Sequence, residues 1–173
     1  MKLEEIKSRK ELIQYFKLKR FKRGAEIGVL QGKFSQYILD TIPDISLLAI
    51  DPWSSPPYIN SREIAYETLS HYENCKIIQQ TSMAAACNVP DESLDFVYID
   101  GDHSFDAVMC DLIVWAKKVK PGGIISGHDY VKWFRGLKRA VNVYTNFHKT
   151  KLYLTEPQRR GSDKYISFYF VKK

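Results

Sequence analysis

The sequence predicts an α/β fold in which a mostly parallel β-sheet carries helices on both faces. Two observations support this prediction. Apolar runs of strand length alternate with segments of helical periodicity, and polar side chains gather where the central runs end. The clearest run, Leu94–Ile99, is followed directly by Asp100, Asp102 and His103. Because open α/β sheets bind ligands outside the carboxyl ends of their strands, this segment also predicts a functional site.

The predicted elements follow one another in a regular order. Apolar residues at helical spacing indicate an amphipathic helix within residues 1–20. The predicted strands cover 25–29, 46–51, 76–79, 94–100, 123–126, 151–154 and 165–171. The predicted helices between them cover 34–39, 61–71, 83–87, 107–119 and 133–147. Ser35 is expected to cap the first of these, and the last two strands, with no helix between them, to form an antiparallel hairpin.

Length and composition predict one domain with its own core. The chain has 173 residues, of which 45% are hydrophobic. Its expected parts are an N-terminal helix (1–20), a cofactor and catalytic core (24–130) and a C-terminal helix and hairpin (131–173). Lys and Arg total 26 against 20 Asp and Glu, a net charge of +6. This excess favours acidic partners, but it is too small to indicate nucleic-acid binding by itself.

The cysteines and the N-terminus predict a cytoplasmic protein without a membrane partner. The three cysteines lack metal-site spacing, which is typical of reduced, half-buried residues. The charged start, Met1 to Glu5, is not followed by the apolar stretch of a signal peptide, and we find no apolar run long enough to span a membrane.

A glycine-bearing turn after the first strand predicts a cofactor site. The segment from Glu26 to Gly32 reads ExGxxxG, with Gly28 between them. Glycines there let the backbone turn tightly and approach a ligand closely. A dinucleotide site would read GxGxxG and hold a pyrophosphate, which Glu26 would repel. A cofactor with a cationic amino group and no phosphate fits better, and S-adenosylmethionine (SAM) is such a ligand.

The next strand ends add further candidate contacts to this cofactor. Asp51 ends the second strand, where a carboxylate can accept hydrogen bonds from both ribose hydroxyls. Trp53 could cover the adenine ring, and Ser82, after the third strand, could bond the adenine edge. Simpler interpretations remain open, because a strand-end carboxylate can serve only a turn and a tryptophan can belong to the core.

Four segments between Ala25 and Tyr130 resemble a known family: AEIGVLQGKFS, LLAIDPW, DFVYIDGDHSFDAV and KPGGIISGHDY. As a set they are similar to class I SAM-dependent methyltransferases. Within that class they resemble the branch of macrocin-type and rhamnosyl sugar O-methyltransferases, which is related to the catechol and caffeoyl-coenzyme A enzymes. The resemblance implies a seven-stranded Rossmann-like sheet whose last strand is antiparallel. It also implies SAM contacts at Glu26, Gly28, Gly32, Ser35, Asp51, Ser82 and Asp100.

Methyl transfer to a hydroxyl requires that the acceptor oxygen be made nucleophilic, by a general base or by a metal. The resemblance implies a divalent cation, Mg²⁺ or Mn²⁺, at Asp100, His128 and Asp129, and a catalytic basic residue at His103. Asp102 and Asp129 complete the expected catalytic residues. His128 stands where close metal-dependent relatives carry a carboxylate. Three alternatives follow: Mg²⁺ held by the two aspartates, a softer metal, or no metal with either histidine as the base.

The expected acceptor is a small molecule, with a sugar or glycoconjugate as the first choice. An RNA or protein acceptor and a non-catalytic SAM-binding protein are the alternatives. The SPPY pattern at 55–58, which amino-methylating enzymes use, follows the second strand here and so predicts only a stiff loop. Since no lid domain is apparent, a homo-oligomer is expected as one way to cover the crevice.

Overall fold

The computed structural model describes residues 1–54, 58–157 and 165–173. They form a seven-stranded sheet in the order β3-β2-β1-β4-β5-β7-β6. The strands are β1 (Arg23–Ile27), β2 (Ser46–Ile50), β3 (Cys75–Ile78), β4 (Leu94–Ile99), β5 (Val119–Gly127), β6 (Tyr153–Leu154) and β7 (Phe168–Val171). All neighbouring pairs are parallel except those of β7, which runs antiparallel to β5 and β6. The predicted α/β, Rossmann-like fold is therefore confirmed.

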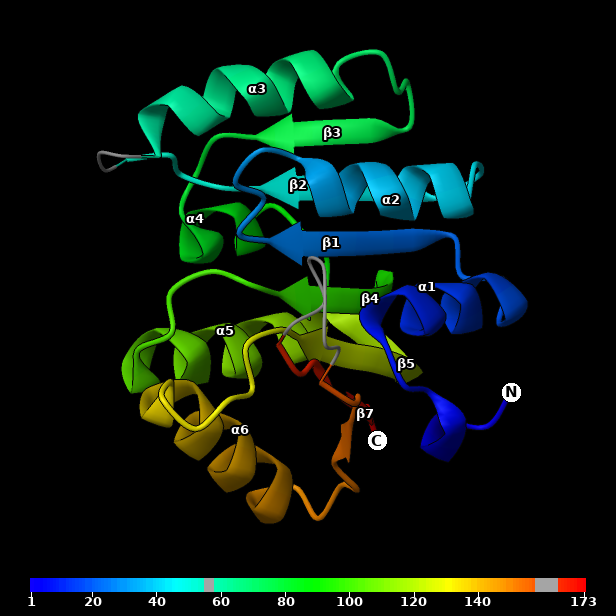
Figure 1. Cartoon of the computed structure of the whole chain (residues 1–173), viewed down its shortest axis with the longest axis vertical. Coiled ribbons are helices and arrows are strands. Elements are labelled where there is room, and N and C mark those ends of the chain that lie inside the picture. Colours follow the sequence, from blue (N-terminus) through cyan, green and yellow to red (C-terminus); the bar gives the residue numbers. More distant parts are fainter. Residues whose placement is uncertain (55–57, 158–164) are drawn as a thin grey trace.

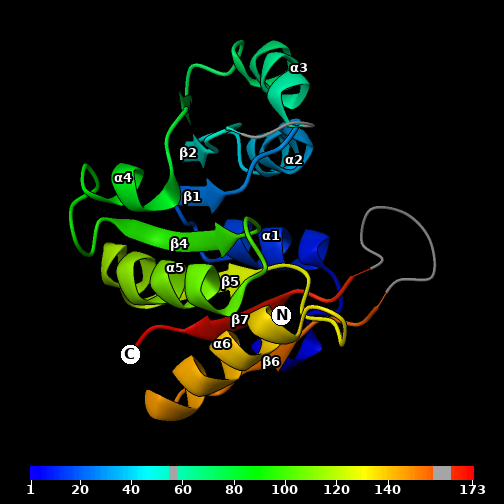
Figure 2. The same ribbon diagram turned by 90° about the vertical axis from the view of Figure 1, so that its left-hand side faces the viewer.

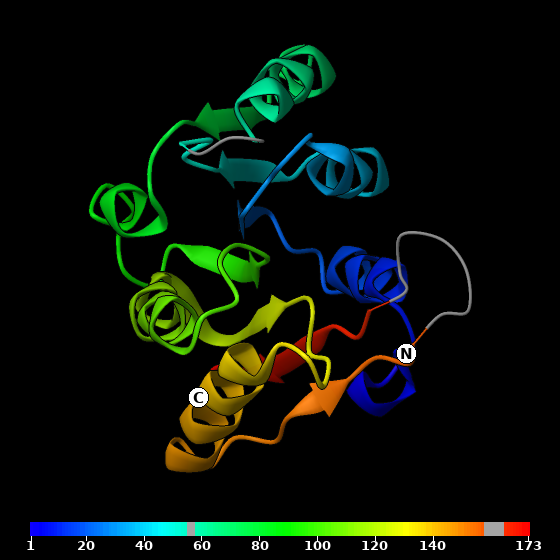
Figure 3. The same ribbon diagram turned by 60° about the vertical axis from the view of Figure 1, so that its left-hand side comes forward.

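Helices cover both faces of the sheet, as Figure 3 shows. They are α1 (Arg9–Leu18), α2 (Lys33–Thr41), α3 (Ile59–Leu69), α4 (Ser82–Ala86), α5 (Phe105–Lys118) and α6 (Arg135–Phe147), preceded by a 3-10 turn, η1 (Leu3–Glu5). The first three pack on one face, around Phe16, Ile38 and Leu69. The last three pack on the other, around Leu112 and Trp115. The strands β2, β4, β5 and β7 bury apolar side chains on both faces, which explains their nearly continuous apolar sequences.

The order of the strands places the functional edge. The chain moves from β1 to β2 and β3 in one direction, then returns to place β4 and β5 on the other side of β1. Such a reversal opens a crevice at the carboxyl ends of the two central strands. The arrowheads of β1 to β4 point to one edge in Figure 1, and Figure 2 turns this edge towards the viewer.

Three local predictions were wrong. The N-terminal helix exists but is shorter than its predicted range of 1–20, because Ser8 accepts a hydrogen bond from the Glu11 amide (3.2 Å) and starts α1 at Arg9. Ser35 does not cap α2, since Gly32 occupies the N-cap with a φ of 79°. β5 begins at Val119 and not at 123, because the strand passes through the Pro-Gly-Gly segment with an irregular register. Such irregularities are usual where glycine interrupts a strand.

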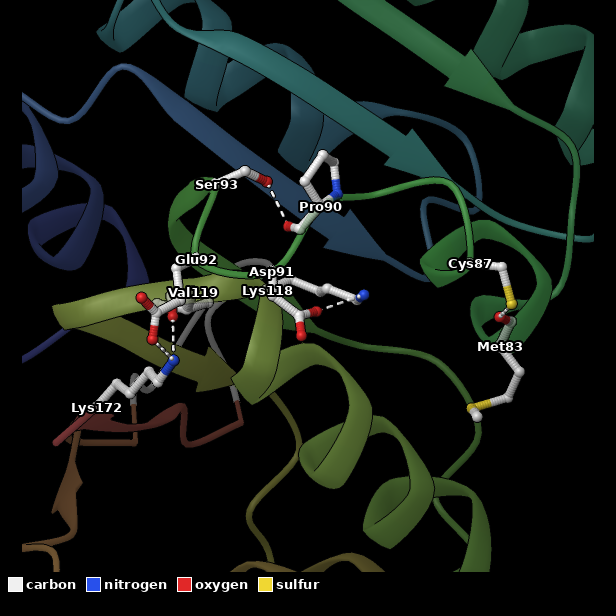
Figure 4. A network of polar contacts seen from close by, with 9 residues as sticks. All are labelled: Met83, Cys87, Pro90, Asp91, Glu92, Ser93, Lys118, Val119 and Lys172. Atoms are coloured by element: carbon white, nitrogen blue, oxygen red, sulfur yellow. Dashed lines mark hydrogen bonds and ion pairs between the residues drawn. The ribbon is translucent and has the colours of Figure 1, made fainter.

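Ion pairs between a largely buried lysine and an exposed carboxylate lie at the opposite edge of the sheet (Figure 4). Lys118 contacts Asp91 at 2.7 Å, and Lys172 reaches the Glu92 carboxylate at 3.3 Å and the Val119 carbonyl at 2.6 Å. Pairs with one exposed partner contribute little each, so we assign this edge a structural role only.

Two other predictions concern cysteines and membranes. All three cysteines are free, but Cys87 and Cys110 are exposed, so only Cys75 is partly buried as expected. In the described part of the chain, no helix is both long and apolar enough to cross a bilayer. The first three residues of the SPPY pattern, 55–57, lie outside the described residues.

Candidate active site

Gly28 brings the ends of β1 and β4 into direct contact. Its φ is 88°, a conformation that favours glycine. A Cβ there would lie 2.7 Å from the Gly101 amide nitrogen and nearer still to the Asp100 carbonyl. Only glycine fits both the backbone angle and the space. The predicted tight turn therefore exists, and it sets Glu26 beside the strand that carries Asp100.

Glu26 is a buried carboxyl group at the end of β1. Its residue is 2% exposed, and the Ser35 hydroxyl donates a hydrogen bond to it. Burial raises the pKa of Glu26 to about 8, opposed by the Ser35 hydrogen bond and the positive charge of Arg9. A cationic group bound beside Glu26 would favour its ionised form. Ser35 thus acts on Glu26 from inside the helix, a role that a cap prediction did not anticipate.

Asp51 holds the loop after β1. One carboxylate oxygen accepts from the amides of Val29 and Leu30, both at 2.9 Å, and the other from the Trp53 amide at 2.8 Å. The Trp53 indole donates to the Leu30 carbonyl at 2.8 Å, and its residue is 3% exposed. Trp53 is therefore core, and its contact with adenine stays a prediction. We call Glu26, Gly28 and Asp51 the β1–β2 wall.

Ser82 belongs to a polar network between α4 and α5. Its hydroxyl donates to the buried Asp111 carboxylate and accepts from the Trp115 indole at 2.7 Å. Burial raises the pKa of Asp111 to about 6, despite the Ser82 hydrogen bond. Sequence analysis missed Asp111, although an acid on the apolar stripe of a helix signals a buried partner. Two hydrogen bonds already engage Ser82, so its adenine contact stays a prediction.

The ends of β4 and β5 bring Asp100, His103, His128 and Asp129 together. We call these four residues the β4–β5 cluster. The Nε2 atom of His103 lies 2.9 Å from Asp129 Oδ2. The Nδ1 atom of His128 lies 3.1 Å from Asp129 Oδ1 and 3.8 Å from Asp100 Oδ1. The predicted meeting of these side chains at one sheet edge is therefore observed.

These contacts do not satisfy the hydrogen-bonding groups of the cluster. Among the described residues, His103 Nε2, His128 Nε2 and Asp129 Oδ1 are buried and without a hydrogen-bond partner. Asp129 has a φ of 60°, a strained conformation for a residue other than glycine. Buried polar atoms without partners are rare and point to a ligand or ion.

Electrostatics differ sharply between the two aspartates of the cluster. Burial raises the pKa of Asp100 to about 8, the charge of His128 opposing this and that of Asp129 adding to it. Burial also disfavours the charged form of Asp129. The neighbouring His103 and His128 outweigh that effect and hold the pKa of Asp129 well below its usual range.

The cluster fits a divalent cation. One ligand atom each from Asp100, His103 and Asp129 lies within 4.8 Å of the others. Carboxylates and imidazoles are metal ligands, and the partnerless atoms are the ones such an ion would engage. His103 thus joins a candidate set that the resemblance had filled with Asp100, His128 and Asp129.

Asp102 stands apart from the cluster's contacts. It is exposed, and its Oδ1 accepts a 2.6 Å hydrogen bond from the amide of Ser104, the N-cap of α5. That backbone hydrogen bond lowers the pKa of Asp102. A carboxylate so stabilised is a weak proton acceptor, and its predicted catalytic role has no support in these contacts.

Aromatic side chains flank the cluster, and sequence analysis missed them. Phe134 stacks on the His103 ring with 4.1 Å between centroids. Tyr165 lies 6.3 Å from the His128 ring and meets Trp133 edge-on at 5.7 Å. Trp133 is 55% exposed. The sequence signal for them was the aromatic segment Tyr-Val-Lys-Trp-Phe that follows Asp129. Its last two residues, Trp133 and Phe134, were assigned to the predicted helix at 133–147 and not to the site.

Fold and family together define the class of this protein. The fold is that of class I SAM-dependent methyltransferases, and the profile of the family described as "Methyltransferase domain" matches residues 25–130. This match spans more than half of the chain, so the chain belongs to that family. The predicted class, a SAM-dependent methyltransferase with SAM as its cofactor, is confirmed.

Solved structures resemble the chain over most of its length. Cofactor-bound Rv0187 from MTB gives a TM-score of 0.76 at 12% identity, covering 95% of this chain and 79% of that one. An O-methyltransferase from Bacillus cereus in complex with SAH gives 0.74 at 17%, covering 94% and 80%. A Clostridium thermocellum protein described as a candidate rRNA methylase gives 0.70 at 14%, covering 96% and 98%. Identities this low show the fold alone.

One curated relative is a much longer protein than this chain. Uncharacterized protein y4gI of Sinorhizobium fredii (strain NBRC 101917 / NGR234) is 24% identical over 87 residues, which is 47% of this chain and 10% of that protein. The chain therefore spans about a tenth of this relative's length.

Proposed function

We propose that this protein transfers the methyl group of SAM to a hydroxyl oxygen of a small molecule. One observation carries the proposal: the Gly28 turn touches the Asp100 backbone, so the β1–β2 wall and the β4–β5 cluster border one crevice. A nucleoside cofactor on the first wall would then present its methyl group to an acceptor beside the second. The O-methyltransferase among the structural matches supports this reaction by analogy of fold.

In this proposal the β1–β2 wall binds the cofactor. Glu26 accepts the cationic amino group of SAM, which restores the charge that burial suppresses. Asp51 contributes its remaining acceptor capacity to the ribose hydroxyls, after holding three loop amides. Gly28 and Gly32 keep the loop backbone close to the ligand, and Ser35 orients Glu26.

The β4–β5 cluster prepares the acceptor oxygen. The Nε2 atom of His103 lies 2.9 Å from Asp129 Oδ2, so a proton taken from the acceptor hydroxyl would be held there as an imidazolium paired with that carboxylate. Phe134 restrains the ring of His103 by stacking. A divalent cation held by Asp100, Asp129 and a histidine would supply a lowered hydroxyl pKa.

The surroundings of the cluster support a choice of acceptor within this proposal. The exposed Trp133 beside Tyr165 offers a flat aromatic surface of the kind that stacks on sugar rings or planar molecules. We therefore keep a sugar or glycoconjugate as the first choice. A homo-oligomer could cover the open crevice. An RNA acceptor is the second candidate, favoured by the net charge of +6 and by the match to a candidate rRNA methylase.

Incubation with methyl-labelled SAM and a panel of glycosides, phenols and RNA tests the proposal. We expect label on oxygen of a small molecule. Label on nitrogen or carbon would contradict O-transfer, and salt-dependent RNA labelling would favour the second candidate. His103→Ala should lower turnover at least about 100-fold with nearly unchanged SAM affinity, whereas Asp51→Ala should weaken SAM binding. His71→Ala, in an exposed position outside the site, is the control.

A further inference from the structure

The β4–β5 cluster contains two histidines, whereas Mg²⁺ prefers oxygen ligands. We propose that it binds a first-row transition-metal ion in preference to Mg²⁺, and that His103 is one of the ligands beside Asp100 and Asp129. This inference concerns the site of the proposed function and deepens it, because it names the kind of cation and a ligand on the loop after β4.

The spacing of the ligand atoms supports a shared ion. Atoms from Asp100, His103 and Asp129 lie within 4.8 Å of one another. A transition-metal ion binds nitrogen and oxygen at about 2.0–2.2 Å, so two of its ligands can be at most about 4.4 Å apart. A shift of a few tenths of an ångström per side chain closes the set around one ion.

Unsatisfied atoms show that the cluster is not complete as a network of protein side chains. His103 Nε2 and Asp129 Oδ1 are buried and lack hydrogen-bond partners, although Nε2 lies 2.9 Å from Asp129 Oδ2 and Oδ1 lies 3.1 Å from His128 Nδ1. Asp129 is 8% exposed and held at a strained φ of 60°. An arrangement built only to pair His103 with Asp129 would align these atoms as a hydrogen bond. Their misalignment fits ligands that point at a common third partner.

The donor chemistry selects the ion. Mg²⁺ requires a nearly ideal octahedron of oxygen ligands and keeps several waters. Imidazole suits Mn, Fe, Co, Ni and Zn. His128, with its Nδ1 at 3.8 Å from Asp100 and 3.1 Å from Asp129, adds a second imidazole at the edge of the same group. Two imidazoles and two carboxylates therefore favour a transition metal.

Metal ligation by His103 would change which proton acceptor the cluster offers. An Nε2 atom that coordinates a cation cannot accept a proton at the same time. The general-base role of His103 therefore belongs to the metal-free protein, whereas a bound cation would itself supply a lowered hydroxyl pKa.

Metal binding can be measured without the methyl-transfer reaction. The metal-free full chain would be titrated with Co²⁺ and with Mg²⁺ by calorimetry, and Co²⁺ ligation followed by visible absorption. We expect Co²⁺ to bind at least about 100-fold more tightly than Mg²⁺, as imidazole ligation favours it. Equal affinity for the two ions would overturn the proposal.

Variants then identify the ligand. His103→Ala and the larger His103→Gln should each weaken Co²⁺ binding at least about 10-fold and change its absorption spectrum, with added imidazole partly restoring it in the alanine variant. His71→Ala should change neither. An unchanged Co²⁺ spectrum in both His103 variants, with folding verified by thermal unfolding, would contradict the assignment. S-adenosylhomocysteine binding, measured in parallel, separates failure of this inference from failure of the proposed function.

Discussion

The two sides of the crevice differ in how far the protein satisfies its own polar groups. On the β1–β2 wall, Asp51 accepts three backbone amides and Ser35 bonds to Glu26. In the β4–β5 cluster, three buried polar atoms of the described chain have no partner. The first wall is thus held in its binding shape by the chain itself, while the second is left for a proton, an ion or an acceptor to complete.

This difference has a physical meaning for function. A preorganised surface binds a cofactor without spending binding energy on rearrangement. An unsatisfied cluster is costly to maintain in a folded protein, which supports our proposal that the chemistry takes place there. We therefore expect substitutions on the first wall to change stability and cofactor affinity. Substitutions in the cluster should mainly change turnover and metal binding.

Gly28→Ala should cause the largest loss of stability, because it disrupts the point where the β1–β2 wall contacts the backbone of Asp100. The added Cβ would collide with the Asp100 backbone at a positive φ. We expect a loss of unfolding free energy of at least about 3 kcal/mol, measured by chemical denaturation. Gly122→Ala is the matched control: its φ of 81° is similar, yet a Cβ there meets nothing within 4 Å. A loss of equal size in both variants would mean that the contact with Asp100 carries no energy.

Glu26→Gln should reduce the pH dependence of the protein's stability, because it removes the buried carboxyl group of the β1–β2 wall. Burial raises the pKa of Glu26 from 4.5 to about 8 in the folded protein. A raised folded pKa stabilises the fold fully below about pH 4.5, and this contribution is lost as pH rises towards 8. Without cofactor, the wild type should lose on the order of a few kcal/mol across this window, and the variant less.

The prediction is checked by thermal or chemical unfolding of both proteins between about pH 4 and pH 9, a range that includes the ordinary pKa of Glu26, 4.5, and its raised pKa of about 8. Asp100, whose pKa is also raised to about 8, leaves part of the slope in the variant. SAM should bind the variant more weakly because a neutral amide replaces the carboxylate. Identical pH curves for the two proteins would contradict the buried, neutral state of Glu26.

Asp51→Asn should have a smaller effect, because it removes one acceptor from a set of three amide contacts. When the amide oxygen faces Val29 and Leu30, the new NH₂ group faces the Trp53 N–H. An unsatisfied donor pair costs about 1–3 kcal/mol. Asp102→Asn is the control, since the bond that Asp102 Oδ1 accepts from the Ser104 amide can be kept by the amide oxygen. A smaller loss for Asp51→Asn than for this control would refute the supporting role of Asp51 in the loop.

Periodicity and strand-end chemistry predicted most of this molecule. Each buried strand is marked in the sequence by an apolar run. Because the carboxyl ends of parallel strands lie at one edge of the sheet, the proximity of Asp100 and Asp129 was predictable. The Gly28 turn was also predictable from the glycine that follows the first strand. The structure shows why glycine is needed there: its φ is positive and the backbone of Asp100 lies close to it.

Contacts set by helix packing could not be predicted in the same way. Ser82 and Asp111 lie on separate helices, and their hydrogen bond depends on how α4 sits against α5. The stacking of Phe134 on His103 depends equally on the path of the chain between β5 and α6. Single-sequence patterns give the faces of elements, but not the distances between side chains on different elements.

A crystal structure of the complex with S-adenosylhomocysteine tests the central claim most directly. We predict its amino group beside Glu26, its ribose hydroxyls beside Asp51 and its sulfur facing the β4–β5 cluster. A nucleoside bound away from Glu26 and Asp51, or a sulfur turned away from Asp100 and Asp129, would contradict a single shared crevice.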